Sequence, residues 1–138
     1  MLDANAAGEM QLFLYFGHGH GQQYLSAGFD RANNKCAASL LMGCSSGAST
    51  PQGLYRSKCA PFSYIEAGCP AAIANLWDVT DRDIDRFSES LLQRWTQTKQ
   101  RPQCIADAVA GARGDTRLPY LTGAAPVCFG VPVSVIRD

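Results

Sequence analysis

The chain has 138 residues, 46% of them hydrophobic, and its 12 basic and 12 acidic side chains give a formal charge of zero. This length fits one domain, and the balanced charge argues against direct binding of nucleic acid or of an anionic membrane. No apolar run reaches the roughly 18 residues that span a bilayer, and the first residues lack a secretory signal pattern, so we expect an intracellular protein.

The cysteine pattern indicates reduced thiols. No CxxC pair and no regular disulfide framework is present. Because no secretory signal precedes them, these thiols are expected to stay reduced. The six cysteines are Cys36, Cys44, Cys59, Cys69, Cys104 and Cys128.

Three short apolar runs follow a small, polar segment over residues 1–10, which is expected to be a frayed lead-in to a core over 11–138. The runs predict buried strands. Their approximate bounds are 11–16, 36–42 and 71–77. Each run stops abruptly, and the residues that follow are Gly17-His18-Gly19, Gly43-Cys44 and Asp78.

Helical patterns lie between and after these runs. Residues 61–67 predict a short helix that stops at Gly68. Thr80 is a good N-cap with Asp83 three positions later, and apolar residues at helical spacing predict a helix over about 81–98. The remaining expectations are a helix over 102–112, a turn-rich passage over 118–126 and an edge strand over 131–136 that contains Pro132.

The alternation of strands and helices favours an α/β fold with a mostly parallel sheet flanked by helices. Only three or four strands are visible, so we expect a partial domain whose first strands lie upstream. Ligands gather beyond the carboxyl ends of the strands in such a sheet. A histidine, a cysteine and an acidic group are therefore expected to meet at that edge.

Cys44 and His18 are the candidate catalytic pair. A thiol in such a turn attacks an acyl group once a base takes its proton. The small residues after it, Ser45 to Gly47, are expected to leave backbone N–H groups free for an oxyanion. Histidine is the usual general base near neutral pH, and His18 lies between two glycines, with His20 as the rival base.

Two plainer interpretations stand beside this one. Most cysteines are structural, so Cys44 could be one more small buried hydrophobe. His18, His20 and Cys44 could also form part of a metal site, but no fourth ligand at recognisable spacing is evident. We therefore expect no metal and no other cofactor.

The acidic group has a structural and a functional interpretation. Carboxylates in the first turn of a helix complement its dipole, and Asp83 is expected to act as such a capping residue. A carboxylate beside a nucleophile can instead receive a substrate arginine, whose guanidinium prefers bidentate carboxylates. The candidates for that second task are Asp78, Asp81 and Asp85.

Five segments in this order resemble separase, the cysteine protease of the caspase-like clan. The resemblance runs from about residue 11 to 136. The segments are Tyr15-Phe16-Gly17-His18-Gly19, Leu41-Met42-Gly43-Cys44-Ser45-Ser46-Gly47, Ala67-Gly68-Cys69-Pro70, residues 75–87 beginning Asn75-Leu76-Trp77-Asp78-Val79-Thr80-Asp81, and Tyr120-Leu121-Thr122-Gly123-Ala124-Ala125-Pro126.

The resemblance implies a caspase-like α/β fold and an endopeptidase that cleaves the kleisin subunit of cohesin after Arg, which releases sister chromatids at anaphase. It also implies a securin-type inhibitor and a location in cytoplasm and nucleus, on spindle and chromatin in mitosis. His18 matches the catalytic histidine and Cys44 the nucleophile. Gly19 and Cys44 would supply oxyanion N–H groups. Asp85 and Asp81 rank above Asp78 as receptors of the P1 Arg.

One further alternative belongs to a different functional class. A truncated sheet could leave the pair of His18 and Cys44 disorganised. The chain would then be a non-catalytic module that binds Arg-containing peptides.

Overall fold

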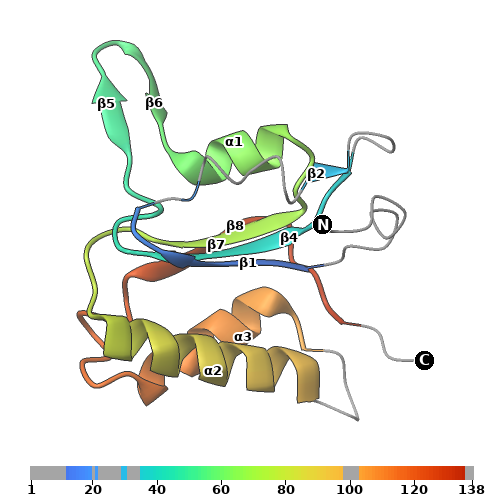
Figure 1. Ribbon diagram of the computed structural model, residues 1–138, viewed down its shortest axis with the longest axis vertical. Helices are drawn as coiled ribbons and strands as arrows, with labels where there is room; N and C mark the ends of the chain where they lie inside the picture. Colours follow the sequence, from blue (N-terminus) through green and yellow to red (C-terminus); the bar gives the residue numbers. More distant parts are fainter. Residues whose placement is uncertain (1–11, 20, 22–28, 31–34, 98–102, 136–138) are drawn as a thin grey trace.

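The computed structural model describes residues 12–19, 21, 29–30, 35–97 and 103–135. Its centre is a four-stranded sheet (Figure 1). The strand order is β1 (Leu12–Gly17), β4 (Ala38–Gly43), β7 (Ala71–Asn75) and β8 (Pro126–Gly130). β1, β4 and β7 run parallel, whereas β8 runs antiparallel to β7. The predicted mostly parallel α/β sheet is confirmed.

Helices cover both faces of the sheet (Figure 1). α1 (Ala60–Glu66) lies on one face, and α2 (Asp81–Gln97) and α3 (Ile105–Ala112) lie on the other. Every residue of β4 and β7 is buried, which explains their continuous apolar sequences. Successive residues of a strand face opposite sides, so Leu40 and Met42 pack toward α2 and Leu41 packs toward α1.

The three helices predicted from capping residues and apolar spacing are present in the structure. α1 stops as predicted, because Gly68 has a positive φ of 88° and its N–H donates to Ile65 O at 2.9 Å. α2 begins at Asp81, as predicted. α3 begins at Ile105 rather than at 102, and Cys104 is its N-cap, with Sγ accepting from the Ala106 N–H at 3.3 Å.

The prediction of a final strand over 131–136 is wrong. The edge strand is β8, which ends at Gly130, one residue before the predicted element would begin. After it, the Val131 N–H still donates to Pro70 O at 2.8 Å, but Pro132 has no N–H with which to continue the ladder. Ser134 forms only an isolated bridge with Cys104, and residue 136 lies outside the described residues.

A hairpin between β4 and α1 has no counterpart among the predicted elements. β5 (Thr50–Gln52) and β6 (Tyr55–Lys58) form it, and it projects away from the sheet beyond α1 (Figure 1). A second antiparallel pair, β2 (Phe29–Asp30) and β3 (Lys35–Cys36), precedes β4. Within the described residues, no helix is both long and apolar enough to cross a membrane.

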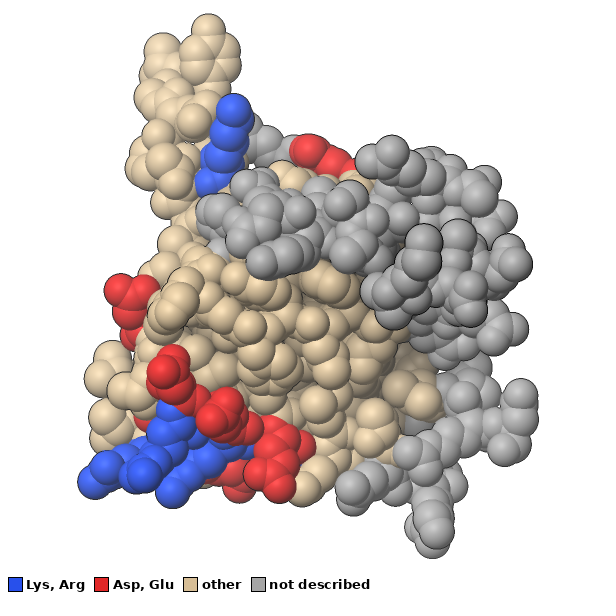
Figure 2. All heavy atoms as spheres, in the orientation of Figure 1, with Lys and Arg blue, Asp and Glu red and all other residues tan. Residues whose placement is uncertain are grey.

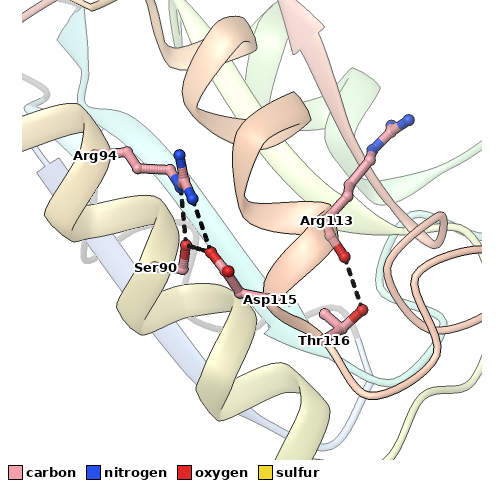
Figure 3. Close-up of polar contacts among 5 residues, drawn as sticks. All are labelled: Ser90, Arg94, Arg113, Asp115 and Thr116. Carbon is pink, nitrogen blue, oxygen red and sulfur yellow. Dashed lines mark hydrogen bonds and ion pairs between the residues drawn. The ribbon is translucent and has the colours of Figure 1, made fainter.

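Charged contacts fix α2 against the turn η3 (Arg113–Asp115). Arg94 Nη2 lies 3.0 Å from Asp115 Oδ2, and Ser90 Oγ donates to the same carboxylate at 2.5 Å (Figure 3). These bonds lower the pKa of Asp115. Figure 2 shows acidic and basic side chains gathered together over the α2 layer, so among the described residues this face has no extended patch of one sign.

The predicted capping box of α2 is present. The Asp83 N–H donates to Thr80 Oγ1 at 3.4 Å, and that hydroxyl donates to Asp83 Oδ2 at 3.2 Å. The other carboxylate oxygen accepts the Arg117 N–H at 3.0 Å. This last bond is the main reason why the pKa of the buried Asp83 carboxyl lies below its ordinary value. Asp83 therefore has the structural role predicted for it.

Substituting Asp83→Asn should lower the free energy of unfolding by about 1–3 kcal/mol at pH 7, because charge-assisted hydrogen bonds are lost. The folded-state pKa is depressed, so this stabilisation is complete above the unfolded-state pKa of about 3.9 and is lost as pH falls below it. Thermal unfolding of wild type and variant at pH 7 and in acid measures the difference. The exposed Asp107→Asn serves as control. Equal midpoints at pH 7 would contradict the expectation.

Candidate active site

Two neighbouring parallel strands bring His18 and Cys44 to the same edge of the sheet. Gly17 pairs with Gly43 at the ends of β1 and β4, and each candidate residue follows its glycine directly. Cys44 packs against the core on the α2 side, and His18 lines a cavity on that side. The structure thus places both predicted catalytic residues at adjacent strand ends, facing the same layer.

The cavity beside His18 has a volume of about 220 Å³ and contains two of the three candidate carboxylates. Asp81 and Asp85 lie one helical turn apart at the start of α2, so both reach the same cavity. Apolar side chains and backbone complete it. The lining residues are Phe16, Gly17, His18, Met42, Asp81, Ile84 and Asp85.

Asp78 lies elsewhere. Its Oδ1 accepts a 2.5 Å hydrogen bond from Ser45 Oγ. It lines a separate groove of about 690 Å³, which also contains Val79, Leu118 and Leu121. The structure therefore brings Asp81 and Asp85 together with His18, whereas Asp78 is hydrogen-bonded to Ser45 of the cysteine turn and lines a different groove.

The half-buried Cys44 thiol is directed at the loop that precedes α2. Its Sγ donates to Val79 O at 3.1 Å. Within the part of the chain that the structure describes, no hydrogen bond joins Cys44 Sγ to His18. Catalytic hydrogen bonds are often formed only when substrate is bound, so a rotation of the Cys44 side chain toward His18 is compatible with this resting geometry.

The prediction that the N–H groups of Ser45, Ser46 and Gly47 are free is wrong. They donate to Trp77 O, Gly43 O and Asn75 O, respectively, at 3.4, 3.3 and 2.7 Å. Ser45 also has a positive φ of 51°, which makes this a tight turn. Buried backbone donors must be paired. Residues at and just after the end of β7 accept two of these bonds, and Gly43 of the same turn accepts the third. Within the described residues, the Cys44 N–H takes part in none of these loop bonds.

Sequence reasoning missed Asn75 and Ser46, which hold this turn. Asn75 is buried at the end of β7, and its Nδ2 donates to Gly43 O at 3.0 Å. The Asn75 N–H donates to Ser46 Oγ at 3.0 Å, and Ser46 Oγ donates to Leu41 O at 2.5 Å. The available sequence pattern was the amide of Asn75 within the apolar run 71–77. Buried polar side chains are usually hydrogen-bonded, so this pattern indicates a structural hydrogen bond.

The loop that carries His18 lies directly against Gly43. A Cβ added at Gly43 would lie 1.8 Å from Gly19 O and 2.8 Å from Gly17 O. Gly19 itself has a positive φ of 69°. The close approach of the histidine loop to the cysteine strand therefore depends on the absence of a side chain at position 43.

Substituting Gly43→Ala should push the histidine loop away from the cysteine strand, because two backbone oxygens block the new methyl group. A misplacement of about 1 Å can cost roughly 10²-fold in rate, so a loss of that order in peptidase activity is expected. Gly114→Ala is the matched control, because a Cβ there meets nothing within 4 Å. Unchanged activity of Gly43→Ala would show that the loop does not need this contact.

The metal hypothesis involves a residue that the structure does not describe. His20 lies outside the described residues. Within the residues that are described, no group of three or more His, Cys, Asp or Glu side chains could hold a metal ion.

The fold and these strand ends define an α/β protein with a candidate thiol and imidazole site. The family model for the separin protease domain matches residues 4–84, more than half of the chain. A separin from Schizosaccharomyces pombe is 47% identical over 130 residues, which cover 90% of this chain and 7% of that protein. A separin from Mus musculus is 43% identical over 127 residues, covering 92% of this chain and 6% of that protein.

A solved structure gives the same result. The Saccharomyces cerevisiae separase–securin complex at 2.6 Å resolution matches with a TM-score of 0.77 and 38% identity, covering 96% of this chain and 9% of that chain. This chain belongs to the separin protease-domain family, which confirms the resemblance and the predicted fold. It spans less than a tenth of the length of these relatives.

Proposed function

We propose that this chain is the catalytic portion of a cysteine endopeptidase that cleaves after arginine. The observation that carries the proposal is that His18 and Cys44 directly follow the paired ends of β1 and β4, and that His18 lines a cavity together with Asp81 and Asp85. Membership of a protease-domain family supports it. Residues 11–138 are the proposed catalytic core.

The proposed reaction is acyl transfer through a thioester. His18 takes the proton of Cys44, and the thiolate attacks the carbonyl carbon after the substrate arginine. The N–H groups of Gly19 and Cys44 stabilise the oxyanion of the tetrahedral intermediate. His18 then gives its proton to the leaving amine, and water activated by His18 hydrolyses the thioester.

The proposed arginine receptor is the pair Asp85 and Asp81. Two carboxylates in one cavity offer the several oxygen acceptors that a planar guanidinium binds best. Both lie beside His18, which a P1 side chain must approach when its carbonyl meets Cys44. No cofactor and no metal enters this scheme.

Family membership supports a proposal for the biological role. We propose the kleisin subunit of cohesin as substrate, with cleavage releasing sister chromatids at anaphase, and a location in cytoplasm and nucleus. The solved relatives from Saccharomyces cerevisiae are separase–securin complexes. They support a securin-type inhibitor as a partner of the protein that carries this chain.

The test is digestion of a kleisin-derived peptide by the complete natural chain, with the products identified by mass spectrometry. Cleavage after arginine, lost when that arginine is replaced by citrulline, is the expected result. Citrulline keeps the shape and removes the charge. Cleavage elsewhere, or indifference to the replacement, would refute the proposed specificity.

One observation favours a second candidate function. Among the described residues, the Cys44 thiol donates to Val79 O and not to His18. A chain locked in this arrangement would bind Arg-containing peptides through Asp81 and Asp85 without cleaving them. Stoichiometric peptide binding without any product would favour this candidate.

A further inference from the structure

Tyr15 lies on the face of the sheet opposite to the cavity. Its side chain packs with Tyr64 and Leu41 on the α1 side, whereas His18 lines the cavity on the α2 side. Tyr15 Oη nevertheless reaches the histidine loop and donates to His18 O at 2.9 Å. The tyrosine therefore contacts the backbone of the loop from behind and does not line the cavity.

The loop is shaped around the Tyr15 ring. A Cβ at Gly17 would lie 2.7 Å from Tyr15 Oη, and a Cβ at Gly21 would lie 2.7 Å from ring atom Cδ1. The ring therefore occupies the space that side chains at both glycines would need. This close packing restricts where the His18 carbonyl can lie.

A second tyrosine anchors the far end of the same loop. Tyr64 Oη donates to Gly21 O at 3.2 Å, and Tyr64 is fully buried on α1. Burial raises the pKa of Tyr64 to about 12, so its hydroxyl keeps the proton that this bond requires throughout the neutral range. With this end fixed, the contact at His18 O sets the orientation of the first peptide of the loop.

The carbonyl that Tyr15 binds belongs to the same peptide unit as the Gly19 N–H. A trans peptide is planar, so its C=O and N–H point in opposite directions. Tyr15 binds this oxygen from the α1 side, so the Gly19 N–H of the same planar peptide is directed away from the Tyr15 hydroxyl. An amide whose oxygen accepts a hydrogen bond is also polarised, which strengthens its N–H as a donor.

We propose that Tyr15 is a positioning residue that orients the Gly19 N–H toward the substrate oxyanion. This inference rests on the proposed function, in which that N–H stabilises the tetrahedral intermediate. Tyr15 touches no reacting atom and acts through the peptide bond between His18 and Gly19. Its contribution is therefore confined to the transition state and should be absent from substrate binding.

The test substitutes Tyr15→Phe in the complete natural chain and measures cleavage of a fluorogenic peptide with P1 Arg. Rates are expressed per active site, titrated with an Arg acyloxymethyl ketone, so that misfolded molecules do not count. We expect kcat to fall about tenfold with KM within about twofold, because a donor is misoriented rather than removed. The acid limb of the pH profile should not move, since the His18 side chain is unchanged.

A transition-state mimic gives a second measurement. A peptide aldehyde with P1 Arg forms a tetrahedral adduct, and its affinity for Tyr15→Phe should fall by about the same factor as kcat. The matched control is Tyr55→Phe, the same chemical change at an exposed position of β6. Unchanged kcat per titrated site, or a change confined to KM, would overturn the inference. An inactive wild type would instead overturn the proposed function, and this inference with it.

Discussion

Cys44→Ser should abolish peptide cleavage, and His18→Ala should lower kcat by roughly 10³-fold or more. A serine hydroxyl is a much weaker nucleophile than a thiolate, and without the imidazole no base takes the proton of the thiol. The fold should survive, because a serine hydroxyl can donate to Val79 O as the thiol does. Steady-state kinetics with an Arg peptide and thermal unfolding measure the two effects separately.

His20→Ala separates the two candidate bases. It should be nearly neutral if His18 is the base, because the pairing of β1 with β4 places His18 directly after the strand end. Robust turnover by Cys44→Ser would show that the nucleophile lies elsewhere. Loss of activity in His20→Ala with full activity in His18→Ala would transfer the role of base to His20.

Asp85→Asn should lower kcat/KM for P1 Arg by roughly 10²-fold, mostly through KM. The guanidinium would enter the cavity without its charged partner, and truncating a close charge pair costs about 2–5 kcal/mol. Asp81→Asn should act in the same direction, because both carboxylates line the cavity. The ratio of kcat/KM for P1 Arg to that for P1 citrulline reports the charge interaction alone and should approach one in the double variant.

Asp78→Asn distinguishes this assignment from its rival. Asp78 accepts a hydrogen bond from Ser45 and lines the other groove, so its substitution should leave the preference of Arg over citrulline intact. If Asp78→Asn removed that preference and Asp85→Asn did not, the receptor would be misassigned. The exposed Asp107→Asn controls for the loss of one negative charge.

The parts of the fold that sequence predicts are those fixed by local chemistry. The start of α2 follows from the capping box of Thr80 and Asp83, which the structure contains. β4 and β7 are buried on both faces, and their apolar runs reflect that burial directly. The placement of His18 and Cys44 at adjacent strand ends follows from one rule, that parallel strands end at the same edge of the sheet.

The features that sequence could not predict depend on distant partners. β8 is a strand because it pairs with β7. The residues after it have a more strand-like composition, but Pro132 has no N–H to donate, so the pairing with β7 does not continue through them. The N–H groups of Ser45 and Gly47 donate to Trp77 O and Asn75 O, at and just after the end of β7, and no local pattern reveals those distant acceptors. The choice of Asp81 and Asp85 over Asp78 as cavity residues likewise required the spatial relation of α2 to β1.

The most direct test of the account is intact-mass analysis of the complete natural chain after incubation with a peptide acyloxymethyl ketone carrying P1 Arg. A P1 Ala reagent and the Cys44→Ser variant run beside it. The account predicts one adduct, located on Cys44 and formed only with the Arg reagent. An adduct on another cysteine, equal labelling by the Ala reagent, or no adduct would contradict the claim that Cys44 is an arginine-directed nucleophile.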